Sequence, residues 1–253
     1  AGDRFASIIA GVRADSTVKA VVLRVNSPGG GVLASEKIKN ELDLLQKDKP
    51  VVASYGEYAA SGGYWISNGS NVVFTDATTL TGSIGVFGMI PDFSKTARDV
   101  LHIGVESVNS HKHGDMFGLM RPFDQSEFNY MTRSIENIYD RFVGIVSDSR
   151  SLTRERVDEI AQGRVWTGAD ALPIELVDEI GTLEDAVNYA ASIAGDPDLS
   201  NWSVCGYPSP QTMMEKVLEM FYGSSDENAL LGRLKDCTEA KVLARMDTQF
   251  EVR

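Results

Sequence analysis

Cysteine, histidine and long apolar runs are all scarce in this sequence, and each shortage excludes a class of protein. With two cysteines, Cys205 and Cys237, in 253 residues, the chain is no disulfide-framed scaffold, and both are expected to be idle thiols unless the compartment is oxidising. Three histidines provide no set with the ligand spacing of a zinc site. No stretch reaches the roughly 18 apolar residues of a membrane-spanning helix, so the sequence predicts no span within the chain.

Basic residues are too few and too scattered for a nucleic-acid-binding surface. The chain has 24 Lys+Arg against 36 Asp+Glu, a formal net charge of −12, and this acidic balance favours solubility. At 43% hydrophobic and 24% charged residues, the composition is that of a globular protein with one large domain, or a domain with an appendage. The first residues lack signal-peptide features and already show helical periodicity, so we expect a piece of a longer protein.

Apolar runs of strand length alternate with segments of helical periodicity. The runs at residues 19–25 and 51–55 predict buried strands, and each is followed by a glycine-rich turn and a helical pattern. Strands are also predicted over residues 81–88 and 105–108, and a long helix over residues 124–150. This alternation predicts an α/β fold with right-handed crossovers.

A single serine, Ser61, stands between small residues directly after the second of these strands. Small neighbours let a substrate carbonyl approach a hydroxyl, and a strand-to-helix turn lifts that hydroxyl out of the sheet. A Ser-Gly-Gly turn without chemistry is the commoner occurrence, but Gly29 and Gly30 also follow a buried strand. The carboxyl ends of parallel strands share one sheet edge, where N–H groups of this glycine turn and of Gly62 can form a pair of oxyanion donors.

The residues leave undecided which base Ser61 would use. A serine hydroxyl is a weak nucleophile until a base accepts its proton. His111 and His113 flank Lys112 in a polar stretch that is typical of an exposed loop. A Ser–His pair, a metal pair with Asp115, and Lys112 with its pKa lowered by burial are the alternatives. An exposed loop without chemistry is the commoner state for all of them.

Four ordered motifs together resemble one family. They are residues 23–30 (LRVNSPGG), 59–67 (AASGGYWIS), 80–88 (LTGSIGVFG) and 161–168 (AQGRVWTG). In this combination the chain is similar to signal peptide peptidase A, a family of serine proteases with the Clp protease/crotonase fold. The resemblance implies an α/β spiral of ββα units over residues 1–195. It further implies a helical C-terminal extension over residues 196–253, packed on the domain or on a neighbouring subunit.

The resemblance also implies roles for individual residues. Ser61 corresponds to the nucleophile of a serine–lysine dyad, and Ser83 to the hydroxyl that orients the lysine. Gly30 and Gly62 correspond to the two oxyanion amides. An extended substrate is then held by strand addition along two segments, which comprise Gly31, Val32, Gly85, Val86 and Phe87. No metal and no cofactor are expected.

The lysine is where this sequence departs from the family. In single-domain members the lysine precedes an Arg-Pro-Phe-like stretch, here residues 121–123, and its place falls on Gly114. Lys112 lies two residues away, about 7 Å along a strand, which is too far for a proton-transfer contact. In long, two-domain members the serine lies in the second half and the lysine comes from the first. We therefore expect this chain to be the second half of a long member, with the lysine supplied by the first half. Lys112 is the alternative base.

The function implied is degradation of cleaved signal peptides through an acyl-enzyme on Ser61. The resemblance further implies a homo-oligomer, the first half of the same protein as a partner, and a membrane anchor outside this chain. The implied location is the bacterial inner membrane, with the catalytic part facing the periplasm. Two alternatives stay open: a catalytically silent scaffold that lacks its base, and a crotonase-type acyl-CoA enzyme, which shares the oxyanion chemistry but needs no nucleophilic serine.

Overall fold

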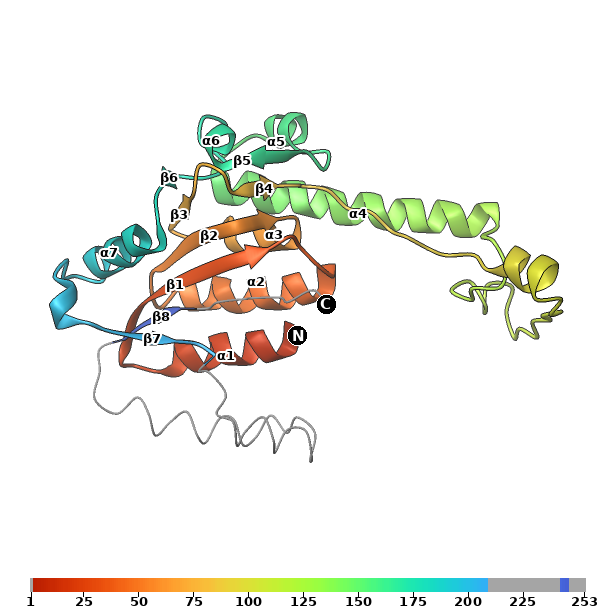
Figure 1. Ribbon diagram of the computed structural model, residues 1–253, viewed down its shortest axis with the longest axis horizontal. Coiled ribbons are helices and arrows are strands. Elements are labelled where there is room, and N and C mark those ends of the chain that lie inside the picture. The colour runs from red at the N-terminus through yellow and green to blue at the C-terminus, as the bar shows by residue number, and fades with distance from the viewer. Residues whose placement is uncertain (1, 209–241, 246–253) are drawn as a thin grey trace, which may run out of the picture. The chain divides into compact units, whose positions relative to one another are not determined.

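The computed structural model describes residues 2–208 and 242–245, and Figure 1 shows their helices and strands. Contacts within the chain divide it into two compact units. Unit 1 comprises Ala1–Ile84 together with Val143–Arg253, and unit 2 comprises Gly85–Phe142. Unit 2 is therefore inserted into the sequence of unit 1, a division that the sequence patterns did not indicate. The predicted boundary at residue 195 stays a prediction.

The predicted α/β alternation is present in the first part of unit 1. The elements follow in the order α1 (Gly2–Ala14), β1 (Val18–Ser27), α2 (Val32–Gln46), β2 (Val51–Ala60), α3 (Gly62–Ser67) and β3 (Val72–Thr75). β1 and β2 pair in parallel, with Val21 opposite Val51. Successive apolar residues of both strands are buried, which is why their sequences are continuous apolar runs.

Strand β2 changes its partner halfway along its length. Its first half pairs in parallel with β3, and its second half pairs in parallel with β4 (Leu80–Gly82). Between the halves, the Asn26 side chain accepts from the Tyr58 N–H at 3.1 Å, and a Cβ atom on Gly56 would come within 3.0 Å of it. The register of β1 against β2 shifts at the same place. The sheet curls accordingly, as in the predicted Clp protease/crotonase-like class.

Short elements after unit 2 complete the sheet and cover it. They are α5 (Arg154–Ile160), β5 (Val165–Thr167), α6 (Gly168–Ala171), β6 (Glu179–Ile180) and α7 (Leu183–Ile193). β5 pairs with β4 in antiparallel orientation, and β6 pairs with β3 in parallel. The side chains of Thr153 and Thr167 cap α5 and α6 by accepting from the N–H groups of Arg156 and Asp170. Helix α7 packs its alanine face against β1, β2 and β3.

The segment after residue 195 adds strands at the β1 edge of the sheet. β7 (Ser203–Gly206) and β8 (Val242–Arg245) pair in parallel, and β8 also pairs in parallel with β1. The sequence predicts a helical extension, whereas its described residues hold a short 3₁₀ turn, η2 (Leu199–Asn201), and these two strands. The unpaired backbone groups of a strand edge favour such additions. Cys237 and the other residues between 209 and 241 lie outside the described residues.

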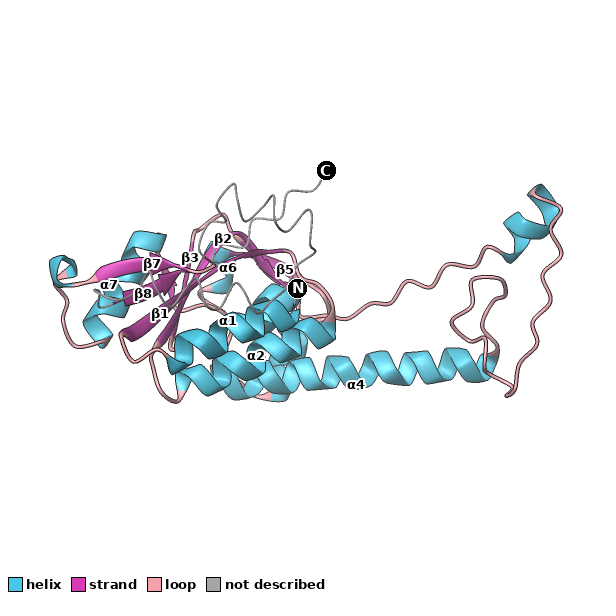
Figure 2. Cartoon of the chain, turned by 90° about the horizontal axis from the view of Figure 1, so that it is seen from below, coloured by secondary structure: helices cyan, strands magenta, loops and turns pink. Residues whose placement is uncertain are grey.

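Unit 2 is mostly loop before α4, as the colouring of Figure 2 shows. It holds a π-helical turn, η1 (Thr96–Val100), and the first part of the long helix α4 (Gln125–Arg150). The strand predicted over residues 105–108 is wrong, because Val105 and Val108 are 50% and 100% exposed and bury no face against a partner. No helix in the described ranges combines the length and the apolar character needed to cross a membrane.

Candidate active site

Ser61 occupies the junction between β2 and α3 in a strained backbone conformation. Its φ of 51° and ψ of −118° lie outside the regions that non-glycine residues ordinarily populate. Two backbone hydrogen bonds hold the residue there. The Ser61 N–H donates to the Gly82 carbonyl at 2.9 Å, and the Trp65 N–H donates to the Ser61 carbonyl at 2.8 Å. A sharp strand-to-helix turn of this kind presents a serine hydroxyl for attack, as in a nucleophile elbow.

The glycine turn after β1 lies directly against Ser61. Gly29 has a φ of +120°, and a Cβ atom there would come within 3.1 Å of the Ser61 Oγ and 2.8 Å of its Cβ. A Cβ atom on Gly62 would come within 3.0 Å of the Gly30 nitrogen. Only glycine allows the two turns to approach this closely. The structure thus brings together Ser61 and the backbone of Gly30 and Gly62, three of the residues singled out in the sequence.

Ser83 follows β4 next to Ser61. β2 and β4 pair in parallel with Ala60 opposite Gly82, so the residue after each of these strands is a serine. Ser83 also has a positive φ, 48°, and its N–H donates to the Arg164 carbonyl at 2.8 Å. Because the Gly82 carbonyl is bonded to the Ser61 N–H as well, the Ser83 backbone is fixed beside the candidate nucleophile.

A buried lysine that belongs to none of the sequence motifs, Lys49, precedes β2. Lys49 is 9% exposed, its Nζ donates to the carbonyls of Val12 and Asp15, and burial lowers the pKa of its ammonium. β2 has ten residues, so about 30 Å of strand separates this ammonium from Ser61. Lys49 therefore caps the carbonyl groups at the end of α1 and is too far from Ser61 to act as its base. Within the described residues, no hydrogen bond joins the Ser61 hydroxyl to a lysine or histidine.

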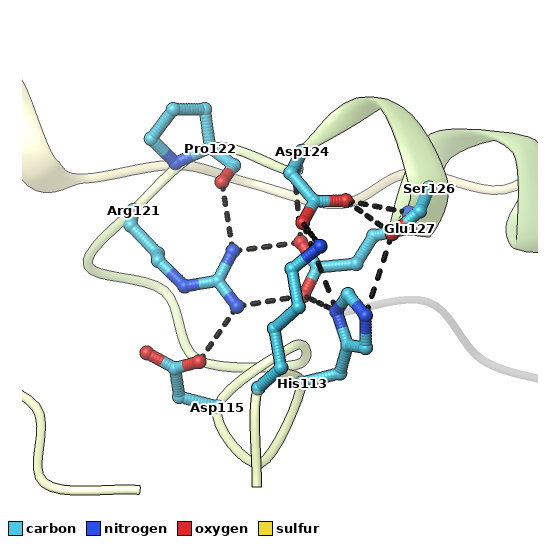
Figure 3. Close-up of polar contacts among 8 residues, drawn as sticks. His113, Asp115, Arg121, Pro122, Asp124, Ser126 and Glu127 are labelled. Carbon is cyan, nitrogen blue, oxygen red and sulfur yellow. Dashed lines mark hydrogen bonds and ion pairs between the residues drawn. The ribbon is translucent and has the colours of Figure 1, made fainter.

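Lys112 and His113 belong to a polar network in unit 2, which Figure 3 shows. The Lys112 side chain is 75% exposed, with its Nζ 3.6 Å from the Asp124 Oδ2. The His113 Nδ1 is 2.9 Å from the Glu127 Oε1. Glu127 itself is 2% exposed. An exposed, ion-paired lysine lacks the burial that a lysine base requires.

Arg121 neutralises the carboxylates of this network. Its guanidinium donates to both carboxylate oxygens of Glu127 at 2.7 Å and to the Asp115 Oδ1 at 2.6 Å. These hydrogen bonds lower the pKa of both carboxyl groups below their ordinary values. His113, Asp124 and Glu127 place ligand atoms within 4.8 Å of one another, but a metal ion would compete with the guanidinium for both Glu127 oxygens. The network is therefore a structural link between the loop and the start of α4.

The segments predicted to bind substrate are not strands in this structure. Gly31 is the N-cap of α2 and Val32 is its first residue. Gly85, Val86 and Phe87 lie in a loop of unit 2, where the Phe87 side chain is 87% exposed. Residues 85–87 pair with no strand of the described chain, so their backbone is open to strand addition. The Gly31 carbonyl, by contrast, already accepts from the Ser35 N–H at 3.1 Å, and Val32 is helical. Their role in substrate binding stays a prediction.

Comparison with known proteins shows what the chain is similar to. Residues 43–195 match the model of "Peptidase family S49". The chain is 43% identical over 226 residues to "Protease 4" of Salmonella typhi, 45% over 195 residues to "Protease 4" of Haemophilus influenzae, and 34% over 244 residues to "Serine protease SPPA, chloroplastic" of Arabidopsis thaliana. These alignments cover 88%, 76% and 94% of this chain but 35%, 31% and 36% of the relatives, so the chain spans about a third of their length. As its resemblance to signal peptide peptidase A predicts, the chain belongs to peptidase family S49.

Proposed function

We propose that this chain carries the nucleophile of a serine protease that cleaves peptides through an acyl-enzyme on Ser61. The observation that carries the proposal is the strained Ser61 backbone beside the Gly30 and Gly62 amides. In this reaction the Ser61 Oγ attacks the substrate carbonyl carbon, a base accepts the hydroxyl proton, and the two amides donate to the oxyanion. Collapse of the tetrahedral intermediate expels the amine, which takes that proton, and water then hydrolyses the ester.

The base in this proposal is a lysine from the first half of the same protein. The relatives are about three times as long as the part aligned here, since the alignments cover 31% to 36% of them. The proposed lysine lies in a segment that precedes this chain within such a longer protein, whereas Lys112 is exposed and paired with Asp124. Ser83 is the residue proposed to orient the incoming ammonium, because its backbone is fixed next to Ser61.

The proposed substrates are cleaved signal peptides, bound in extended form along Gly31, Val32 and residues 85–87. Backbone pairing suits such substrates, because it recognises an extended chain without requiring a fixed sequence. A membrane anchor outside this chain would hold the protein at the bacterial inner membrane with the site facing the periplasm. The apolar cores of signal peptides would then be released close to the enzyme.

Unit 2 supports the further proposal that the protein assembles with copies of itself. Large apolar side chains are exposed on this unit, among them Phe87, Met89, Val100, Val108 and Phe117. Exposed apolar side chains are the kind of surface that a protein partner covers. Sedimentation of the full-length protein would measure the number of subunits.

Fluorophosphonate labelling tests the catalytic proposal, because the probe reacts with an activated serine. The full-length protein should be labelled on Ser61, and this chain alone should not be. Labelling of this chain alone that disappears in Lys112→Ala would instead assign the base to Lys112. A full-length protein that resists the probe would be a catalytically silent scaffold, and the proposal would be wrong.

A further inference from the structure

Helix α2 holds the short helix α3 through two adjacent side chains. The first is Glu36, whose Oε2 accepts a hydrogen bond from the Trp65 Nε1 at 3.1 Å. Trp65 is 2% exposed and lies one helical turn after Ser61, whose carbonyl accepts from the Trp65 N–H. The indole therefore connects α2 directly to the turn that carries the proposed nucleophile.

The second side chain is that of Ser35, which lies between the two glycine turns. Ser35 is 7% exposed, and its Oγ donates to the Gly31 carbonyl at 3.3 Å. A Cβ atom on Gly62 would come within 2.7 Å of the Ser35 Oγ, so the hydroxyl packs against the Gly62 backbone. Ser35 thus contacts both turns that supply the proposed oxyanion amides.

We infer that Ser35 and Glu36 are positioning residues that set the distance between the Gly30 and Gly62 amides, an inference that rests on the proposed function. Gly30 belongs to the turn before α2, whereas Gly62 is the first residue of α3, so their separation depends on how the two helices are held together. α3 has six residues, and the strained conformation before it persists only where the surroundings fix it. The Glu36–Trp65 hydrogen bond provides such a constraint away from the reacting atoms.

The inference predicts a selective loss of transition-state stabilisation. Displaced amides bind an oxyanion less well, whereas a peptide bound along its whole length in the ground state is little affected. Loss of the Glu36 contact should therefore lower kcat and leave KM unchanged. A residue that only stabilised the fold would instead lower the unfolding temperature and the amount of active enzyme.

Steady-state kinetics of the full-length protein with a cleavable peptide test the inference. Glu36→Ala and Trp65→Phe should each lower kcat about tenfold with KM within about twofold, and the double variant should be no worse than either alone. Glu36→Gln keeps an acceptor for the indole and should restore kcat. Trp202→Phe is the matched control and should leave kcat unchanged. Its indole donates to the Asp196 carbonyl at 2.8 Å, and it precedes β7, which is the last strand of the sheet on the side away from β4.

A peptide boronic acid gives a second readout, because its adduct with Ser61 places an oxygen where the oxyanion forms. Glu36→Ala should weaken boronate binding by the same factor as kcat. It should not change the affinity of the substrate peptide in a Ser61→Ala background. Equal losses in the Gln and Ala variants, or a raised KM with unchanged kcat, would overturn the inference. Failure of the proposed function differs: the wild-type protein would not cleave the peptide, or would stay active as Ser61→Ala.

Discussion

Ser61 and Ser126 each lie at the start of a helix, and their surroundings differ in kind. Ser126, in the first turn of α4, lies next to an imidazole that in turn contacts a carboxylate. Its Oγ is 3.4 Å from the His113 Nε2, and the His113 Nδ1 is 2.9 Å from the Glu127 Oε1. Ser61 has no such partners among the described residues. By an inventory of side chains alone, Ser126 would be the better candidate for a nucleophile.

The backbone reverses that ranking. The Ser126 hydroxyl donates to the Asp124 carboxylate at 2.8 Å, so its proton points away from the imidazole, and Glu127 is held by Arg121. Ser61 instead combines strained dihedral angles with two glycine turns packed against it. Fixed backbone amides therefore surround the serine proposed as the nucleophile, whereas the serine–histidine–carboxylate set belongs to a helix start held by ion pairs.

Alanine substitution of Ser61 and of Ser126 should give the largest difference in peptide cleavage between the two regions. Ser61→Ala removes the attacking oxygen and should lower peptide cleavage by the full-length protein at least about a thousandfold. Ser126→Ala removes no reacting atom and should leave cleavage within about twofold. A fluorogenic peptide assay measures both rates. Equal losses in the two variants would erase the distinction between the two serines.

Gly62→Ala should have the next largest effect. The added Cβ would lie 2.7 Å from the Ser35 Oγ and 3.0 Å from the Gly30 nitrogen, so the two turns must move apart, and we expect kcat to fall about a hundredfold. Gly11→Ala is the matched control, because an added Cβ on this residue of α1 meets no atom within 4 Å. Alanine there favours the helix by about 0.5–1 kcal/mol. Full activity of a folded Gly62→Ala enzyme would show that this close packing is unimportant.

The site in unit 1 could largely be predicted because local features build it. The apolar runs at residues 19–25 and 51–55 predict parallel strands, and parallel pairing brings the turns after them to one sheet edge. The place of Ser83 followed only from resemblance to a family, since β4 has three residues and offers no periodicity. Lys49 was missed because nothing in a single sequence shows that a lysine will be buried against a helix end.

Unit 2 was not predictable in this way for a physical reason. The apolar residues 105–108 have a strand pattern, but a strand forms only where a partner and a core bury one of its faces. Arg121, whose side chain is 31% exposed, pairs with the buried carboxylate of Glu127. One residue lies in a loop and the other in α4, so no helix or strand period relates them. The exposure of Lys112 was foreseen as the common state of a lysine in a polar loop.

The network of His113, Arg121 and Glu127 should weaken in acid. The backbone hydrogen bonds that hold Ser61 involve no ionisable group and should not. Hydrogen bonds from Arg121 hold the pKa of Glu127 below its ordinary value of 4.5. The ionised carboxylate therefore stabilises the folded network fully above that pH, and this stabilisation is lost as the pH falls below it toward the lowered pKa. Hydrogen exchange of residues 111–127, corrected for intrinsic rates, should show protection falling from about pH 5 to about pH 3.

Glu127→Gln should lower this protection at neutral pH and flatten its fall in acid. The dependence that remains comes from Asp115 and Asp124. Hydrogen bonds from Arg121 lower the pKa of Asp115, and hydrogen bonds from the Glu127 N–H and the Ser126 hydroxyl lower that of Asp124. Glu136→Gln, on an exposed position of the same helix, is the matched control and should leave the profile unchanged. Peptide cleavage at neutral pH should stay within about twofold in both variants, since neither removes a reacting group. A wild-type protection profile that is flat down to about pH 3 would mean that the network persists without its charges. The start of α4 would then not differ from the turn at Ser61, the proposed nucleophile, in being held by ionised groups.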